Sequence, residues 1–207
     1  HIESALLYVK RMVVNSAVQE QHQDYLEEGN SLLYPFQDRG VLAYDIPEGV
    51  TTYTSETISV GSVPNSLVIG VLKSDSFHGK ADVGSYAFTP AGLESVQVTL
   101  DGDPFVYNEL SLKDDNFTRA YDSLFTVGKT KHIGLTYEAY KNTTALVAYS
   151  LLPGDSSNER QLQRTGSLRV HLKFKQPTTT PLTVICYTER PCVMGVGKDF
   201  KVTIESV

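Results

Sequence analysis

Hydrophobic and polar residues alternate with a period of two along several stretches of the chain, the pattern of β-strands that bury one face. The clearest stretch is 167–175, whose apolar face consists of Leu168, Val170, Leu172 and Phe174. A connection rich in proline and threonine follows, and Leu182–Tyr187 then resumes with β-branched and apolar residues. We expect these two strands to pair as an antiparallel hairpin over a core.

Other stretches have the composition of strands buried on both faces. Ser66–Lys73 is a continuous apolar run and predicts a central strand, and Ala145–Leu152 predicts another buried strand. Ser4–Val14 opens with apolar residues at successive positions, which predicts a strand buried between two layers. Alternation or threonine-rich composition predicts further strands at residues 39–46, 50–60, 93–100 and 200–205.

Helices are predicted only in the connections. Ser16 and Gln19 form a capping box that begins a short helix ending before Gly29. Asp114 or Asp115 is expected to cap a second helix, and residues 137–141 favour a further helical turn. Stretches without a sustained period predict surface loops at residues 74–92, 129–142 and 153–165.

These elements together predict an all-β protein: an antiparallel two-sheet jelly-roll sandwich with short helices in the connections. We expect residues 1–207 to form a single jelly-roll domain, since a chain of this length can bury a core without disulfides or metals. The chain begins at His1 rather than at a methionine, directly in a strand-like run, which suggests a fragment, a processed product or a tag remnant.

Charge and hydropathy narrow the function classes. Charged residues are 20% of the chain and the net charge is -6, and the longest basic stretch is Lys10-Arg11, so no nucleic-acid footprint is visible. No apolar run approaches the roughly 20 residues of a membrane helix. Cys186 and Cys192 are the only cysteines. A disulfide between them would close a short loop, but two free, buried thiols are favoured.

The sequence predicts no catalytic, cofactor-binding or metal site. His171 lies on the polar face of its strand, and Lys173 stands where a metal-binding cupin would place its second histidine. The other histidines are His1, His22, His78 and His132, and none is spaced as a metal pair.

Three further motifs offer reactive or ligating residue types. Asp75, Ser76 and His78 supply the residue types of a triad, but neighbouring loop positions do not make its geometry. Asp101 and Asp103 flank Gly102 and favour a hairpin turn over a calcium site. Gly195–Lys198 lacks the spacing of a phosphate-binding loop and predicts a turn.

Several segments, taken in order, resemble a known family. They are Ala5–Lys10, Ser66–Val71, Asp75–Gly79, Phe117–Phe125, Gly166–Phe174 and Val184–Glu189. Their order and spacing over Ser4 to Glu189 resemble the C-terminal half of the hexon-like major capsid protein of Maverick/Polinton-type elements and adintovirus-like DNA viruses. No single segment is diagnostic, because each is largely a core-packing pattern.

The resemblance implies a double-jelly-roll coat protein whose second jelly roll is this chain. Such proteins form trimeric capsomers that tile an icosahedral shell. The implied partners are other copies of the chain in a homotrimer, neighbouring capsomers, a preceding N-terminal jelly roll, and penton or minor capsid proteins. The implied location is the virion capsid, assembled inside the host cell, and the implied role is structural, without an enzymatic activity or a cofactor. We expect Tyr86 and Phe88 to lie in assembly contacts.

A second function class fits the same residues. A lectin-like or receptor-binding jelly roll would use tyrosine-bearing loops, and the twelve tyrosines and absence of tryptophan suit either role. The two roles differ in their surfaces, because a coat subunit buries large areas against its own copies whereas a recognition module keeps a ligand pocket. An enzyme on this scaffold lacks a convergent set of titratable residues.

Overall fold

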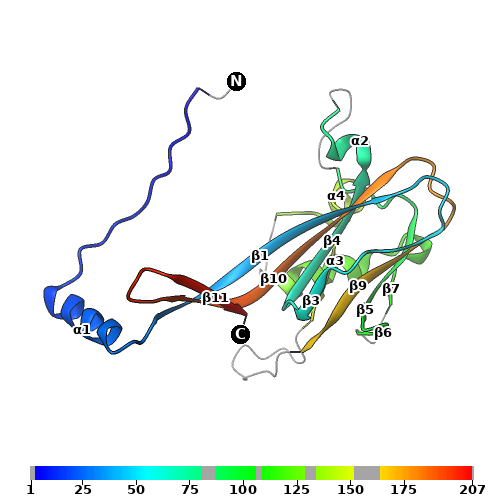
Figure 1. The fold of residues 1–207 in the computed structure, drawn as a ribbon. Coiled ribbons are helices and arrows are strands. Elements are labelled where there is room, and N and C mark those ends of the chain that lie inside the picture. Colours follow the sequence, from blue (N-terminus) through cyan, green and yellow to red (C-terminus); the bar gives the residue numbers. More distant parts are fainter. Residues whose placement is uncertain (1–2, 81–86, 106–108, 129–133, 152–163, 207) are drawn as a thin grey trace. The chain divides into compact units, whose positions relative to one another are not determined.

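The computed structural model describes residues 3–80, 87–105, 109–128, 134–151 and 164–206 (Figure 1). Contacts within the chain divide it into two compact units. The sandwich unit comprises Gln37–Pro191 with Ser206–Val207, and the terminal unit comprises His1–Phe36 and Cys192–Glu205. Three strands, β1, β10 and β11, have residues in both units.

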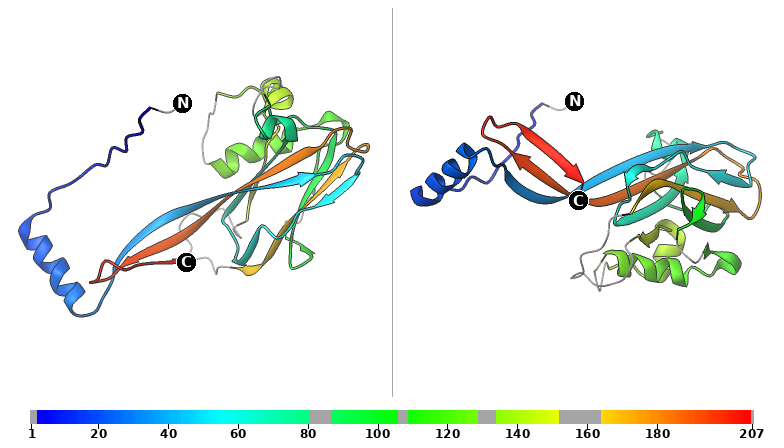
Figure 2. Two further views of the ribbon diagram at one scale, coloured as in Figure 1. Left: turned by 45° about the horizontal axis from the view of Figure 1, so that its top comes forward. Right: turned by 60° about the horizontal axis from the view of Figure 1, so that its bottom comes forward.

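The strands form two antiparallel sheets, shown from two further directions in Figure 2. Sheet A has the order β1 (Leu32–Ile46), β10 (Leu182–Val196), β4 (Ser66–Lys73) and β8 (Val147–Ser150), with β11 (Val202–Ser206) pairing with β10. Sheet B has the order β2 (Thr52–Thr54), β9 (Thr165–Phe174), β5 (Leu93–Leu100) and β6 (Asp103–Pro104), with β3 (Ser59–Ser62) pairing with β9 and β7 (Leu110–Ser111) with β5.

The helices of the described residues are α1 (Ser16–Glu27), α2 (Ser74–Phe77), α3 (Thr118–Gly128) and α4 (Tyr137–Thr143), with a 3-10 turn at Lys113–Asp115. Among the described residues, helices α2 to α4 lie in connections between strands, and α1 precedes the first strand. The two longer helices begin one or two residues away from the predicted caps. Asn15 rather than Ser16 caps α1, accepting from the backbone N–H of Ala17, and Asn116 accepts from the N–H of Thr118 just before α3.

The chain passes repeatedly from one sheet to the other. After β1 in sheet A come β2 and β3 in sheet B, then β4 in A, β5 to β7 in B, β8 in A, β9 in B and β10 in A. Most neighbouring strands of a sheet are therefore distant in sequence, which is how a jelly roll is wound, and the direct neighbours β5–β6 and β10–β11 are the exceptions. This confirms the predicted fold class, a two-sheet antiparallel jelly-roll sandwich with short helices in its connections.

One predicted pairing is wrong. β9 and β10 do not form a hairpin, because β9 lies in sheet B and β10 in sheet A. The connection between them is anchored by Thr178, which is buried and exchanges backbone hydrogen bonds with the turn at 47–50: Gly49 N–H donates to Thr178 O, and Thr178 N–H donates to Val50 O. The β1–β2 and β9–β10 connections thus pass between the sheets side by side. The period of two along each strand shows which face is buried but does not show which sheet the strand joins.

The core lies between the two sheets of the sandwich unit. Sheet A contributes Leu67, Ile69, Val71 and Val184, and sheet B contributes Val96, Val98, Leu168, Val170 and Leu172. The predicted dry face of β9 is buried as expected. β4 is covered on both faces as predicted, because the position of Gly70 is overlaid by the side chains of Phe88 and Leu146.

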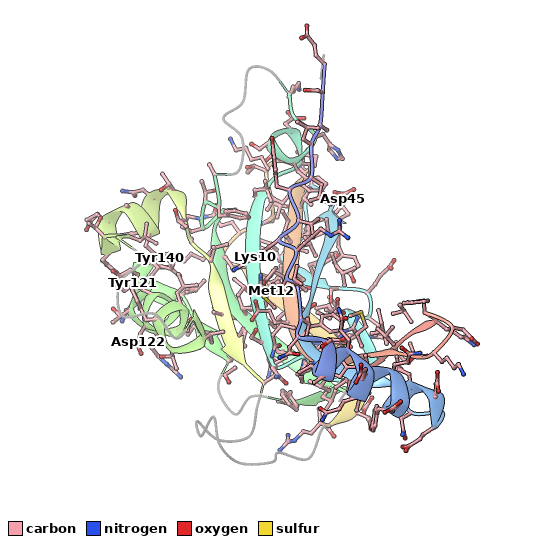
Figure 3. The ribbon with its side chains drawn as sticks, turned by 90° about the vertical axis from the view of Figure 1, so that its left-hand side faces the viewer. Lys10, Met12, Asp45, Tyr121, Asp122 and Tyr140 are labelled. Atoms are coloured by element: carbon pink, nitrogen blue, oxygen red, sulfur yellow. The ribbon has the colours of Figure 1, made fainter. Side chains whose placement is uncertain are left out.

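Helix α3 covers the β8 side of sheet A. The outermost strand in the sheet order is β8, and its Ala148 N–H donates to the Ser123 hydroxyl of α3 over 3.3 Å. Tyr121 of α3 packs edge-to-face against Tyr140 of α4, with ring centroids 5.2 Å apart (Figure 3). A side chain of α3 thus satisfies a backbone donor on β8, and covering an edge in this way blunts its tendency to pair with another chain.

The predicted buried strand at Ser4–Val14 is wrong for the described residues. This segment has no helix or strand, and all its side chains are exposed. The apolar pattern typical of an interior strand is present, but such a strand needs neighbouring strands and a layer on each face. Nothing in the described part of the chain provides them.

Candidate assembly surfaces

The triad-type residues at Asp75, Ser76 and His78 do not assemble a catalytic site. Ser76 is 4% exposed within α2, so its hydroxyl does not face a substrate. The Asp75 carboxylate forms an ion pair with Lys80, 3.0 Å from the ammonium nitrogen. The ring of His78 packs against Phe77. Asp75 and His78 thus have local structural partners and Ser76 is buried, so the three groups do not form a catalytic relay.

His171 lies on the outer face of sheet B and forms hydrogen bonds there. Its Nδ1 lies 2.8 Å from the Thr54 hydroxyl on β2 and its Nε2 lies 2.9 Å from the Thr99 hydroxyl on β5. The imidazole therefore links three neighbouring strands. Burial, and to a smaller extent the charge of Arg169, lower the pKa of His171 below its ordinary value. The sequence placed this residue on the polar face correctly, but it is half-buried between hydroxyls rather than freely solvated.

The remaining motifs are turns. Asp101 and Gly102 both have positive φ and join β5 to β6, and the Asp101 carboxylate accepts from the Ser167 N–H over 2.8 Å. Gly197 joins β10 to β11, and its N–H donates to Lys201 O. The turn predicted at Asp101–Asp103 is confirmed, and the turn predicted at Gly195–Lys198 begins later, at Gly197, because Gly195 and Val196 end β10. Among the described residues there is no group of three or more His, Cys, Asp or Glu side chains that could hold a metal ion.

The cysteines are free, as predicted, and both are buried. Burial raises the pKa of the Cys186 thiol to about 12. A thiol buried in apolar surroundings is inert because the thiolate is the reactive form. Cys186 therefore belongs to the core and not to a site.

The described part of the sandwich unit has one surface depression to compare with the ligand pocket expected of a recognition module. This open, shallow depression is lined by Thr54, Ser55, Glu56, Thr57 and Arg169. Ligand sites are generally concave and lined mainly by apolar and aromatic groups. This lining is polar and carries no aromatic ring. Separately, none of the described helices is long and apolar enough to cross a membrane.

Phe88 is not available for assembly contacts in the way the sequence suggested. It is half-buried, and its ring overlays Gly70 of β4 beside Leu146. A charge at this position would disturb the sandwich itself. Tyr86 and most of the 153–165 loop lie outside the described residues, as does the first part of the 129–142 loop.

Strand β1 presents a second edge of sheet A. Within the sandwich unit, two ion pairs link β1 to β10: Arg39 with Glu189 at 3.1 Å, and Arg190 with Asp38 at 2.8 Å. The Thr183 hydroxyl donates to the Asp45 carboxylate over 2.9 Å. As the residue number rises along β1, the number of its partner falls by the same amount along β10. The two ion pairs and the hydrogen bond therefore belong to one continuous antiparallel register.

Exposed apolar side chains concentrate in the terminal unit. Among the described residues, every large hydrophobic side chain that is exposed belongs to this unit except Val41, Leu42 and Val60. Conversely, Cys192 is the only buried residue among the hydrophobic residues described in this unit. The exposed set comes from the N-terminal segment, α1, β1, β11 and the turn before β11, and includes Leu7, Tyr8, Leu33, Phe36, Phe200 and Ile204.

Sequence reasoning missed part of this surface. The strand predicted at 39–46 begins at Leu32, and Leu33, Tyr34 and Phe36 are therefore strand residues. Aromatic and branched residues at these positions were a usable signal, but Pro35 interrupted it. The final strand was predicted with an apolar face of Phe200, Val202 and Ile204, and all of these are exposed in the described structure.

No protein-family model matches the chain, and no curated protein matches its sequence. The fold is similar to that of a chain in the cryo-EM structure of the Sputnik virophage, with 10% identity, a TM-score of 0.55, and coverage of 86% of this chain and 39% of the virophage chain. The mavirus major capsid protein has a TM-score of 0.48 at 10% identity over 86% and 42% of the two chains. A chain of the PBCV-1 virus capsid model has a TM-score of 0.46 at 9% identity over 92% and 54%. The chain spans about half or less of each of these relatives, and the Sputnik likeness shows a shared jelly-roll fold.

Proposed function

We propose that this chain is a structural subunit of a viral capsid that acts by binding copies of itself. The observation that carries the proposal is the jelly-roll fold shared with a chain of the Sputnik virophage. Fold alone does not imply function, so the surfaces supply the second support. A coat subunit needs a rigid sandwich and apolar area to bury against other subunits, and the chain has both.

The finer form of the proposal is a hexon-like major capsid protein of Maverick/Polinton or adintovirus type. In that form the chain is the second jelly roll of a double-jelly-roll subunit, and three subunits make a capsomer of an icosahedral shell. Its partners are neighbouring capsomers and penton or minor capsid proteins, its location is the virion, and assembly takes place inside the host cell. The order of the six sequence segments supports this form. We propose no enzymatic activity, because Asp75 and His78 have structural partners and Ser76 is buried.

The experiment is the mass in solution by light scattering over a concentration series, for this chain and for the polypeptide that includes any sequence preceding His1. A mass three times that of the polypeptide supports the capsomer, the reference for this chain being 22.8 kDa. A polypeptide with a second jelly roll that remains a monomer at every concentration contradicts it. In that case glycan and peptide binding would be measured, since a lectin-like or receptor-binding role then explains the fold better.

A further inference from the structure

The N-terminal segment, residues 4–14, is the most exposed apolar stretch of the described chain. Leu7 and Tyr8 are each 90% exposed and Val13 is 101% exposed. Monomeric soluble proteins rarely expose contiguous apolar patches of this kind unless another surface covers them. Figure 3 shows the segment as an extended trace that carries Lys10 and Met12.

The composition of the segment favours a strand over a helix. Leu6, Leu7, Tyr8 and Val9 are consecutive, so both faces of an extended segment are apolar. That is the pattern of a strand covered on two sides. Asn15 caps α1 immediately afterwards, which separates the segment from that helix. Eleven extended residues would span about 36 Å, at roughly 3.3 Å per residue.

The segment stands outside the winding of the sandwich. The alternation between sheets begins with β1, which follows α1, and each later strand has its place in that order. Residues 4–14 have no place in either sheet of the described chain. A strand formed by this segment is therefore free to pair with a sheet outside the 207 residues.

The terminal unit also exposes apolar side chains that another surface is expected to cover. Of the hydrophobic residues described in it, only Cys192 is buried, while α1 has no buried residue. A small set of paired strands without a core is marginally stable in water. The Sputnik chain extends well beyond the shared fold, since this chain covers only 39% of it. A domain of the same polypeptide is an occupant of adequate size.

We propose that residues 4–14 form a β-strand in a sheet of a domain that precedes His1 in the same polypeptide, and that the apolar side chains of the terminal unit pack against that domain. This inference rests on the proposed function, because it takes the preceding jelly roll as the occupant. It goes further in naming the segment and the unit that join the two domains.

Hydrogen exchange measured by mass spectrometry tests the strand. The backbone amides of residues 4–14 are compared in the 207-residue chain and in the longer polypeptide encoded with its preceding sequence. We expect exchange in the longer polypeptide to be slower by roughly a hundredfold or more, because amides in an interior strand exchange only through cooperative opening. The protection should not change on dilution, because the contact lies within one polypeptide.

A matched pair of substitutions tests the packing. Val9→Asp places a charge in the segment, and Val60→Asp places the same charge on β3 at a side chain of comparable exposure, 81% against 69%. In the 207-residue chain both variants should unfold at the same urea concentration as the wild type. In the longer polypeptide, Val9→Asp should abolish the protection of residues 4–14, whereas Val60→Asp should keep it.

Three results would overturn the inference: equal exchange of residues 4–14 in both polypeptides, protection that disappears on dilution, or a gene in which no folded domain precedes His1. Loss of protection on dilution would assign the cover to a second copy of the chain. A different result would contradict the proposed function alone. A longer polypeptide that protects residues 4–14 yet never exceeds the mass of a monomer would keep this inference and contradict the capsomer.

Discussion

The hydroxyl of Tyr149 on β8 donates a hydrogen bond of 2.8 Å to the backbone carbonyl of Val96 on β5. The two residues lie in different sheets, so this bond crosses the core of the sandwich. Tyr149 is 5% exposed, and burial raises the pKa of its phenol well above the ordinary value. The phenol is thus a neutral donor that links the two layers.

Replacing Tyr149 by phenylalanine should lower the free energy of unfolding by about 1–2 kcal/mol, because the bond is lost and the buried carbonyl of Val96 loses a donor. The measurement is urea denaturation followed by circular dichroism. Tyr25→Phe on α1, where the side chain is 46% exposed, is the control and should change little. Equal effects of the two substitutions would show that the bond across the core contributes nothing measurable.

Gly70→Ala should destabilise the sandwich by about 1–3 kcal/mol, the usual cost of overpacking a filled core. A Cβ at Gly70 would lie 2.5 Å from a Phe88 ring carbon and 2.6 Å from a Leu146 methyl carbon. Gly197→Ala is the matched control, since its nearest neighbour would be 3.8 Å away. Thermal unfolding of both variants decides the matter, and an unchanged midpoint for Gly70→Ala would mean that Phe88 moves aside freely.

His171 should make the protein less stable as the pH falls. Its folded-state pKa is lowered from the ordinary 6.5 by burial, so the unfolded chain binds more protons between the two pKa values. The free energy of unfolding therefore falls as the pH drops through 6.5 and levels off below the folded-state pKa.

His171→Gln should remove this part of the pH dependence, seen as a flatter plot of urea midpoint between pH 7.5 and pH 5. His22→Gln controls for the loss of an imidazole from an exposed position on α1. A slope for His171→Gln as steep as that of the wild type would assign the acid sensitivity to other groups.

The two thiols should react at different rates with a thiol reagent in the 207-residue chain. Cys186 is fully buried in the sandwich and burial raises its pKa to about 12, so its labelling should wait for unfolding of the core. Cys192 is buried in the terminal unit, which has no core, and should label at least about tenfold faster through local opening. Cys186→Ala and Cys192→Ala isolate each thiol, and equal rates would indicate that the two units open together.

The buried faces of two strands of the sandwich unit could be predicted from the sequence. The buried face of β9 and the double-sided burial of β4 followed from local periodicity, and the Asp101-Gly102 turn followed from the backbone conformations that those residues tolerate. These features depend on residues close together in the chain. The free state of both thiols was also predicted correctly.

The partners of those strands were decided only by the tertiary structure. Alternation specifies which side of a strand is dry, but it does not specify the neighbouring strand, so β9 and β10 were paired wrongly although each was found. The same limit explains residues 4–14, whose apolar pattern predicted burial while the described chain offers no cover. The local pattern thus determined which side chains of each segment are suited to burial. Long-range packing decided which of them are buried, because burial depends on surfaces that sequence neighbours do not supply.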